Sequence, residues 1–232
     1  KITSAGRTFW RGQLHGHDVV IALSGIGKVA AATTTTVLAE RFGVTQIVFT
    51  GVAGGLGGGV NVGDVVVAQD YLQHDMDASP IFERWHVPGY PQVRMACDAS
   101  LTEKLLTATR ETVARDSHEI DWTALGMAAN HAPQVHTGLI VSGDRFVCTA
   151  QECNALRNAL EAAQHQVLAV EMEGAAVAQV CTDYGIAFAA VRTISDRADD
   201  SAHLDFMQFV EKVASKYADH IVHAFLKALP RN

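Results

Sequence analysis

Two acidic residues, Glu171 and Glu173, lie two positions apart in AVEMEGAAVAQV (169–180), where an apolar run gives way to a helical pattern. A buried carboxylate costs free energy unless another group binds it. In an extended strand the two side chains share one face, which suits a polar ligand. Acidic residues are also common in the first turn of a helix. The pair therefore predicts either a ligand-binding site or merely the start of a helix.

A second candidate pair, Arg192 and Asp196, closes another apolar run in VRTISDRADD (191–200). Asp is a frequent helix N-cap, and on local sequence that is the better interpretation of Asp196. The alternative is a carboxyl group held near a ligand. In that case Asp196 and Glu173 would converge on the same molecule.

An aromatic residue, Phe146, follows a third apolar run in IVSGDRFVCTAQE (140–152), just beyond the point where a strand should end. A ring in that place can stack on a flat ligand, and stacking on a nucleobase is worth roughly 1–3 kcal/mol. The ring can equally fold back over the edge of the strand. The local sequence favours neither interpretation.

The stretch SGIGKVA (24–30) follows a predicted strand, opens a helix and formally matches the dinucleotide pattern G-x-G-x-x-A. That fingerprint needs an acidic residue about 20 positions later, and no Asp or Glu lies between Arg41 and Gly63. A P-loop is excluded because Ala22 and Val29 replace its first Gly and its Ser or Thr. What remains is a place where glycine backbone can approach a ligand at a helix N-terminus.

A second glycine-rich stretch, TGVAGGLGGGVNVGD (50–64), also comes directly after a predicted strand. Its simplest interpretation is a flexible turn. Ligands of open α/β sheets, however, bind in the crevice outside the carboxyl ends of the strands. Two such turns after neighbouring strands favour a shared ligand crevice.

The elements that must position these residues are apolar runs of strand length that alternate with helical patterns. Predicted strands cover 18–25, 46–51, 64–73, 135–143, 166–172 and 186–195. Predicted helices cover 28–42, 99–115, 151–164, 173–184 and 205–228. The alternation predicts one domain over residues 1–232, an α/β fold with three α/β/α layers and a mostly parallel, mixed central sheet. We expect the strand ends, and with them the candidate residues, to gather at one edge of that sheet.

One long segment, MDASPIFERWHVPGYPQVRM (76–95), has the composition of a loop, with three prolines and several aromatic residues. A loop of this length in a compact domain is usually functional. The alternative is a poorly ordered excursion from the fold.

The composition limits the classes of partner. A net charge of −7 and a pI near 5.8 argue against a nucleic-acid surface, and no apolar stretch reaches the ~20 residues of a membrane span. No signal peptide opens the chain. The four cysteines have no CxxC spacing and the histidines form no HExxH motif, so we expect reduced thiols in a cytoplasmic protein and no bound metal.

Five motifs occur in order: SGIGKVAA, TGVAGGL with VGDVVV, GLIVSGDRFV, AVEMEGAAVAQVC and VRTISDRAD. Together they resemble the nucleoside phosphorylase and nucleosidase superfamily, and within it the 5'-methylthioadenosine/S-adenosylhomocysteine nucleosidases. The similarity runs from about residue 9 to the C-terminus. The resemblance implies a nucleoside phosphorylase-like fold and hydrolysis of the N-glycosidic bond between adenine and a 5'-thioribose, with a small nucleoside as substrate and no cofactor.

The resemblance also implies roles for single residues. Asp196 would deliver a proton to N7 of the departing adenine, and Glu173 would bind the ribose hydroxyls while Glu171 is structural. Phe146 would stack on adenine, and the backbone of Val147 would read the edge of the base. The remaining residues matched to the substrate site are Met172 at the sugar, Arg192, Ser195, Ile26, Ala53 and Gly54.

The chain departs from the family pattern at two places. Members begin with a strand and a helix whose glutamate activates the nucleophilic water, whereas this sequence starts at Lys1. We expect that segment to be missing from this chain, so the water-activating base is not assigned. Phe49 and Val52 occupy the positions with which sister phosphorylases hold phosphate. Because an anion needs charged or polar donors, hydrolysis is favoured over phosphorolysis.

Three alternatives stay open: a purine nucleoside phosphorylase, a futalosine-type hydrolase, and a non-enzymatic nucleoside-binding or storage protein of the same fold. The resemblance further implies a homodimer in which the 76–95 loop lies near the interface. We expect Phe82, Trp85 and Tyr90 to be exposed there, since aromatic residues are common in interfaces. The sequence does not identify the preferred 5' substituent.

Overall fold

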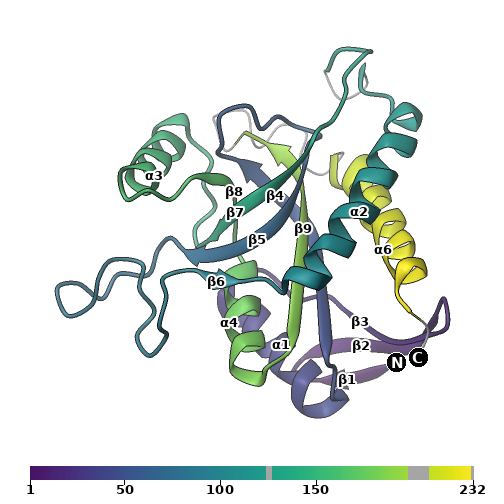
Figure 1. Cartoon of the computed structure of the whole chain (residues 1–232), viewed down its shortest axis with the longest axis horizontal. Coiled ribbons are helices and arrows are strands. Elements are labelled where there is room, and N and C mark those ends of the chain that lie inside the picture. The colour runs from purple at the N-terminus through teal and green to yellow at the C-terminus, as the bar shows by residue number, and fades with distance from the viewer. Residues whose placement is uncertain (124–126, 198–208, 231–232) are drawn as a thin grey trace.

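The computed structural model describes residues 1–123, 127–197 and 209–230 of the 232-residue chain (Figure 1). Six strands form the main sheet: β4 (Gln46–Gly55), β5 (Val65–Gln73), β6 (Met95–Ala96), β7 (Val135–Ser142), β8 (Val167–Glu171) and β9 (Ala187–Asp196). Their order is β6-β5-β7-β8-β4-β9, and β5 also pairs with β9. The additional pairing closes five of the strands into a ring.

The α/β class is confirmed, but the prediction of three layers around a mostly parallel sheet is wrong. The β4–β9, β5–β7 and β7–β8 pairs are parallel, whereas the β4–β8, β5–β9 and β5–β6 pairs are antiparallel. The registers shift between Ala68 and Asp70 in β5 and between Ala53 and Gly54 in β4. Such irregularities bend a strand and increase its twist, which lets one long sheet curl until β5 meets β9.

The first predicted strand, 18–25, does not belong to the main sheet. It corresponds to β3 (His17–Ala22), which pairs with β2 (Arg7–Leu14), and β2 pairs with β1 (Ile2–Ser4), all antiparallel. Residues 19 and 20 of β3 are only half-buried. The placement of this strand in a parallel sheet was therefore wrong, because its continuous apolar run also suits a short antiparallel meander.

Five α-helices surround the ring within the described residues, and four of them form two pairs. The five are α1 (Lys28–Phe42), α2 (Ala99–Asp116), α3 (Ala150–Ala162), α4 (Gly174–Tyr184) and α6 (Ser215–Ala228). In Figure 1, α2 and α6 lie side by side, and α1 packs beside α4. The predicted helices are confirmed, although 205–208 of the last one lie outside the described residues. No helix in the described ranges is long and apolar enough to cross a bilayer.

Local sequence signals set the helix ends. The Asp98 side chain accepts a hydrogen bond from the Leu101 amide and starts α2, and Thr149 does the same for the Glu152 amide at α3. Helices α1 and α4 end at glycines in the left-handed conformation, Gly43 at φ 61° and Gly185 at φ 65°. Such glycines are the usual terminators of helices.

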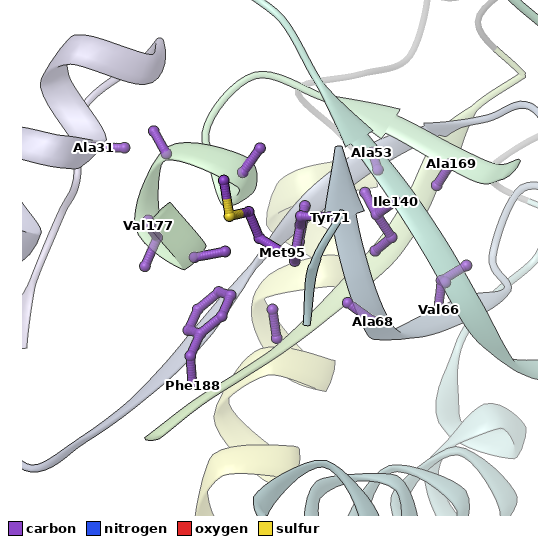
Figure 2. Close-up of a cluster of buried hydrophobic side chains, with 14 of the residues drawn as sticks. Ala31, Ala53, Val66, Ala68, Tyr71, Met95, Ile140, Ala169, Val177 and Phe188 are labelled. Carbon is purple, nitrogen blue, oxygen red and sulfur yellow. The ribbon is translucent and has the colours of Figure 1, made fainter. Parts of the chain in front are cut away.

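A buried apolar cluster lies between the ring and helices α1 and α4 (Figure 2). Tyr71 of β5 and Phe188 of β9 face each other there with ring centroids 5.9 Å apart, and Met95 and Val177 pack beside them. A second cluster, which includes Leu105 of α2, fills the space between the ring and the α2–α6 pair. The first cluster matters for function because it holds the start of α4, which follows Glu173.

The segment between β5 and β6 is a loop, as predicted, but Trp85 is not exposed. Its side chain is buried, and Nε1 donates a hydrogen bond to the His74 carbonyl at 2.9 Å. The expectation that Trp85 would face a partner is therefore wrong, because the loop folds back over its own tryptophan. Phe82 is exposed and Tyr90 is half-buried.

Candidate active site

Four strand ends meet through three successive residue pairings. Ser142, which ends β7, lies opposite Glu171, which ends β8. Val170 of β8 lies opposite Gly54 of β4, and Gly54 lies opposite Asp196, which ends β9. Because neighbouring strands are about 4.8 Å apart, the backbones of Val170 and Asp196 are about 10 Å apart, with β4 between them. The strands β4 and β8 overlap only at their tips, so their ends meet although they run in opposite directions.

Glu171 is a structural centre of this edge. Its Oε2 accepts a hydrogen bond from the Arg192 guanidinium at 2.7 Å, and both side chains are almost completely buried. Ser142 donates its hydroxyl proton to Oε1, and the Gly174 amide donates to both carboxylate oxygens at 3.0 and 2.9 Å. This carboxylate therefore has its partners within the protein, as the sequence-based assignment of a structural role requires.

Arg192 lies beneath the site, with its guanidinium carbon 4.1 Å from the centroid of the Phe49 ring. Its Nη1 donates to the Phe49 and Val191 carbonyls at 3.4 and 3.2 Å. A Cβ at Gly51 would lie 3.4 Å from Nη1, which is an ordinary van der Waals contact. In this structure Arg192 pairs with the buried carboxylate of Glu171.

Glu173 precedes α4 directly and is half-buried. Its Oε1 accepts a hydrogen bond from the Gly27 amide at 2.8 Å, so the first glycine-rich turn reaches the site from the smaller sheet. Burial raises the pKa of Glu173, and the negative charge of Glu171 adds to the shift, against the stabilising Gly27 amide. Of the two acidic residues in the opening motif, Glu173 is the one that faces other loops.

Asp196 is the last residue of β9 and is 7% exposed. Its Oδ2 accepts the Ser195 hydroxyl at 2.8 Å, and the same hydroxyl lies 3.5 Å from the Ala53 carbonyl. The N-cap interpretation of Asp196 depends on residues 198–208, which lie outside the described residues. The described part places Asp196 and Ser195 against β4, at the same edge as Glu171.

The other predicted residues surround this edge. Phe146 is 41% exposed in the connection between β7 and α3, and the neighbouring Val147 is buried. Met172 is half-buried between the two glutamates. Ala53 and Gly54 are buried at the end of β4, whereas the side chain of Ile26 is 82% exposed beside Gly27. The individual roles of these residues stay predictions.

Three charged residues near the site were not predicted. Lys28 begins α1, Asp75 follows β5 and Asp144 follows β7, and the three are joined by hydrogen bonds. Each of the three follows an apolar run in the sequence, and this position was the one signal that could have indicated them as site residues. Nothing local indicated that the three groups meet, because they are separated by 47 and 69 positions.

Two surface hollows lie away from these residues. One lies beside the start of β9, far along the strand from Asp196, and its lining includes Cys97 and Cys181. The other borders the first glycine-rich turn and is lined by Trp10 and Leu23 among others. Neither hollow is lined by Glu173 or Asp196. The candidate site is therefore located from the positions of these polar residues at the strand ends and not from a surface hollow.

Comparison with known proteins agrees with this placement. The family model described as "Phosphorylase superfamily" matches residues 1–227. A 5'-methylthioadenosine/S-adenosylhomocysteine nucleosidase of Bacillus thuringiensis is 37% identical over 223 residues, which are 95% of this chain and 86% of that protein.

Solved structures give the same result. The nucleosidase of that name from Neisseria meningitidis, in complex with methylthio-immucillin-A, superposes with a TM-score of 0.82 at 36% identity, covering 98% of this chain and 89% of the other. A futalosine hydrolase mutant of Helicobacter pylori gives a TM-score of 0.78 at 30% identity, covering 95% and 87%. The chain is thus similar over nearly its whole length to proteins that act on nucleosides.

Proposed function

The chain belongs to the phosphorylase superfamily and, within it, to the family of 5'-methylthioadenosine/S-adenosylhomocysteine nucleosidases, and from this premise we propose the reaction that it catalyses. It hydrolyses the N-glycosidic bond of 5'-methylthioadenosine, S-adenosylhomocysteine or both, releasing adenine and a 5'-thioribose. The observation that supports this proposal is that two carboxylates, Glu173 after β8 and Asp196 at the end of β9, belong to strand ends that meet at one edge of the ring.

Asp196 acts as the general acid. Adenine leaves as a near-anion, and a proton delivered to its N7 stabilises it, an effect that typically contributes ~10²–10⁴-fold to the rate. A carboxyl group that donates a proton near neutral pH needs surroundings that disfavour its charged form. The burial of Asp196 supports this role. The hydroxyl of Ser195, hydrogen-bonded to Oδ2, orients the carboxyl group.

Glu173 binds the ribose hydroxyls and stabilises the positive charge that develops on the sugar ring. The Gly27 amide fixes its Oε1. Phe146 stacks on the adenine, the Val147 backbone reads the edge of the base, and Met172 contacts the sugar. The other lining residues are Arg192, Ile26, Ala53 and Gly54. Water is the nucleophile, and its activating base is not among the residues assigned here.

The test is adenine release from 5'-methylthioadenosine by the purified chain, followed by liquid chromatography with and without inorganic phosphate. We expect release that does not depend on phosphate, because Phe49 packs on Arg192 where a phosphate site would need a free donor. Release only in the presence of phosphate would replace hydrolysis by phosphorolysis. Binding of the nucleoside without any release would favour a binding or storage protein.

Futalosine hydrolysis is the second candidate, because a solved futalosine hydrolase mutant is similar over 95% of this chain. The two reactions break the same type of bond and differ in the base and in the 5' substituent that the site must accept. Parallel assays with futalosine and 5'-methylthioadenosine compare kcat/KM directly. A higher value for futalosine would reassign the substrate while keeping the reaction class.

We also propose a homodimer with the 76–95 loop near the interface. Ile81 and Phe82 in this loop are 81% and 42% exposed, and aromatic and aliphatic side chains of this kind are typical of interface cores. Sedimentation velocity at micromolar concentration tests the proposal, and a monomer would contradict it. A cytoplasmic location is proposed as well, supported by four free cysteines.

A further inference from the structure

The N-terminus of α1 has no cap of its own. Gly27 occupies the N-cap position and offers no side chain, so the first amides of the helix need partners from elsewhere. The Gly27 amide donates to Glu173 at 2.8 Å and the Lys28 amide donates to Asp144 Oδ1 at 2.7 Å. Carboxylates at a helix N-terminus are favourable. Carboxylates from two other loops thus accept hydrogen bonds from the first amides of α1. One of these carboxylates is Glu173, the residue proposed to bind the ribose.

Asp75, in the loop after β5, binds both the start of α1 and the loop that carries Asp144. Its Oδ1 accepts the Lys28 ammonium at 2.5 Å, and its Oδ2 accepts the Asp144 backbone amide at 2.8 Å. The side chains of Lys28 and Asp75 are 17% and 31% exposed. The Asp75 carboxylate therefore bridges the first residue of α1 and the loop after β7.

The Lys28 ammonium also connects to α4. It donates to Gln73 Oε1 at 3.2 Å, and Gln73 Nε2 donates to Gln179 Oε1 at 2.7 Å. Gln179 lies in α4, the helix that follows Glu173. The hydrogen-bonded set of Lys28, Asp75 and Asp144 is here called the Lys28 network. It joins the start of α1 to the loop that carries Phe146 and, through Gln73, to α4.

We propose that Asp75 is a positioning residue for the glycosidic reaction: through Lys28 and the Asp144 amide it holds the Gly27 turn against Glu173 and fixes the loop that carries Phe146. The proposal rests on the proposed function, since it concerns how the sugar and base ligands are placed. Asp75 itself contacts no substrate in this scheme. Its effect reaches the substrate through Lys28 and the adjacent Gly27, whose amide binds Glu173, and through Phe146, two residues after Asp144.

A purely structural role would predict a different pattern. If the Lys28 network only stabilised the loops, its loss would lower the melting temperature and leave the kinetic constants of the folded fraction unchanged. A positioning role changes KM at constant folding. Because Glu173 and Phe146 contact the nucleoside before and during the reaction, KM should rise more than kcat falls.

The experiment compares Asp75→Asn with Asp77→Asn in the full chain. Asp77 is in the same loop, is about half exposed and has partners within that loop, Ser79 and, at 4.0 Å, Arg84. For 5'-methylthioadenosine we expect Asp75→Asn to raise KM at least tenfold with kcat within about fivefold, and Asp77→Asn to match the wild type. Lys28→Met should reproduce the effect, and the double variant Asp75→Asn/Lys28→Met should be no worse than the more affected single variant, since both remove one network.

Thermal melting by circular dichroism accompanies each assay. If Asp75→Asn does not fold, Lys28→Met alone decides the question by the same KM criterion. Wild-type kinetic constants in a folded variant, or fully additive effects in the double variant, would overturn the positioning role while leaving the proposed function intact. A wild-type chain that binds 5'-methylthioadenosine without cleaving it fails the proposed function instead, and the dissociation constants of the same variants then replace KM as the test.

Discussion

The carboxylate of Glu171 and the guanidinium of Arg192 form an ion pair at 2.7 Å in which both side chains are at most 2% exposed. Taking two charges out of water is costly, and their attraction repays the cost only with good geometry and further hydrogen bonds. Ser142 and the amides of Glu173 and Gly174 supply those bonds to Glu171. The pair fixes the segment from which Glu173 emerges.

Glu171→Gln should therefore destabilise the protein strongly. The substitution leaves the Arg192 charge buried without its counter-charge, and such losses cost about 3–5 kcal/mol. Urea unfolding measures the change as a shift of the midpoint. The matched control is Glu152→Gln, which removes the partly exposed Glu152–Arg145 pair and should cost at most about 1 kcal/mol. Equal midpoints for the two variants would contradict this account of the buried pair.

Asp196→Asn should abolish most turnover with little loss of affinity. A general acid acts mainly in the transition state, so kcat should fall by about 10²–10⁴ while the dissociation constant of the nucleoside stays within about tenfold. Stopped assays measure kcat, and isothermal titration calorimetry measures the dissociation constant. The control Asp18→Asn alters a carboxylate that bonds to exposed Gln13 and should behave as the wild type. A near-normal kcat in Asp196→Asn would leave Asp196 with the role of a helix cap.

Glu173→Gln should make the folded protein more stable at pH 7 while it impairs catalysis. Burial and the charge of Glu171 raise the pKa of Glu173 above its ordinary value of 4.5. Folding therefore favours the protonated form, and this contribution is complete below the unfolded pKa and is lost as the pH rises through the folded pKa. The gain of the variant at pH 7 should be small, below about 1 kcal/mol, because the side chain is half-exposed and solvent screens its charge.

Thermal melts of Glu173→Gln and wild type at pH 7 and pH 4 test this sign. A difference of 1 kcal/mol corresponds to roughly 2–4 °C in Tm for a chain of this length. We expect the variant to melt higher at pH 7 and the two proteins to converge toward pH 4. A variant that melts lower at pH 7 would mean that the folded protein stabilises the Glu173 charge.

Gly174→Ala should destabilise the start of α4. A Cβ at this position would lie 2.2 Å from Cε1 of Tyr71, whose ring is fully buried in the cluster of Figure 2. Overpacking of this kind costs about 1–3 kcal/mol, which exceeds the gain in helix propensity of up to about 1 kcal/mol. The control is Gly58→Ala, where an added Cβ meets nothing within 4 Å. Urea midpoints should fall for Gly174→Ala alone.

The sequence predicted the parts of the fold that depend on local pattern. All six predicted strands and the helical segments within the described residues are present in the structure, with five of these strands in the main sheet, because continuous apolar runs and capping residues act locally. The ordered motifs predicted the family, and the family is confirmed. The strands at 2–4 and 7–14 were missed, since their mixed polar and apolar residues give no clear period.

The remainder depends on contacts between distant segments. Closure of the ring requires residues 65–67 to pair with 191–193, and no local pattern encodes that register. The burial of Trp85 depends on the carbonyl of His74 on the far side of its own loop. The role of Lys28 depends on Asp75 and Asp144. Each of these two follows a separate strand, and neither local sequence indicates a contact with Lys28.

The two edges of β9 are occupied by different neighbours, β4 along its length and β5 over residues 191–193. The proposed proton donor, Asp196, thus ends a strand that hydrogen-bonds to neighbours on both sides, whereas Glu173 and the Phe146 loop are held by side-chain hydrogen bonds between loops. Substitutions in these loops should therefore change which nucleoside is bound, while the backbone pairing that places Asp196 stays unchanged.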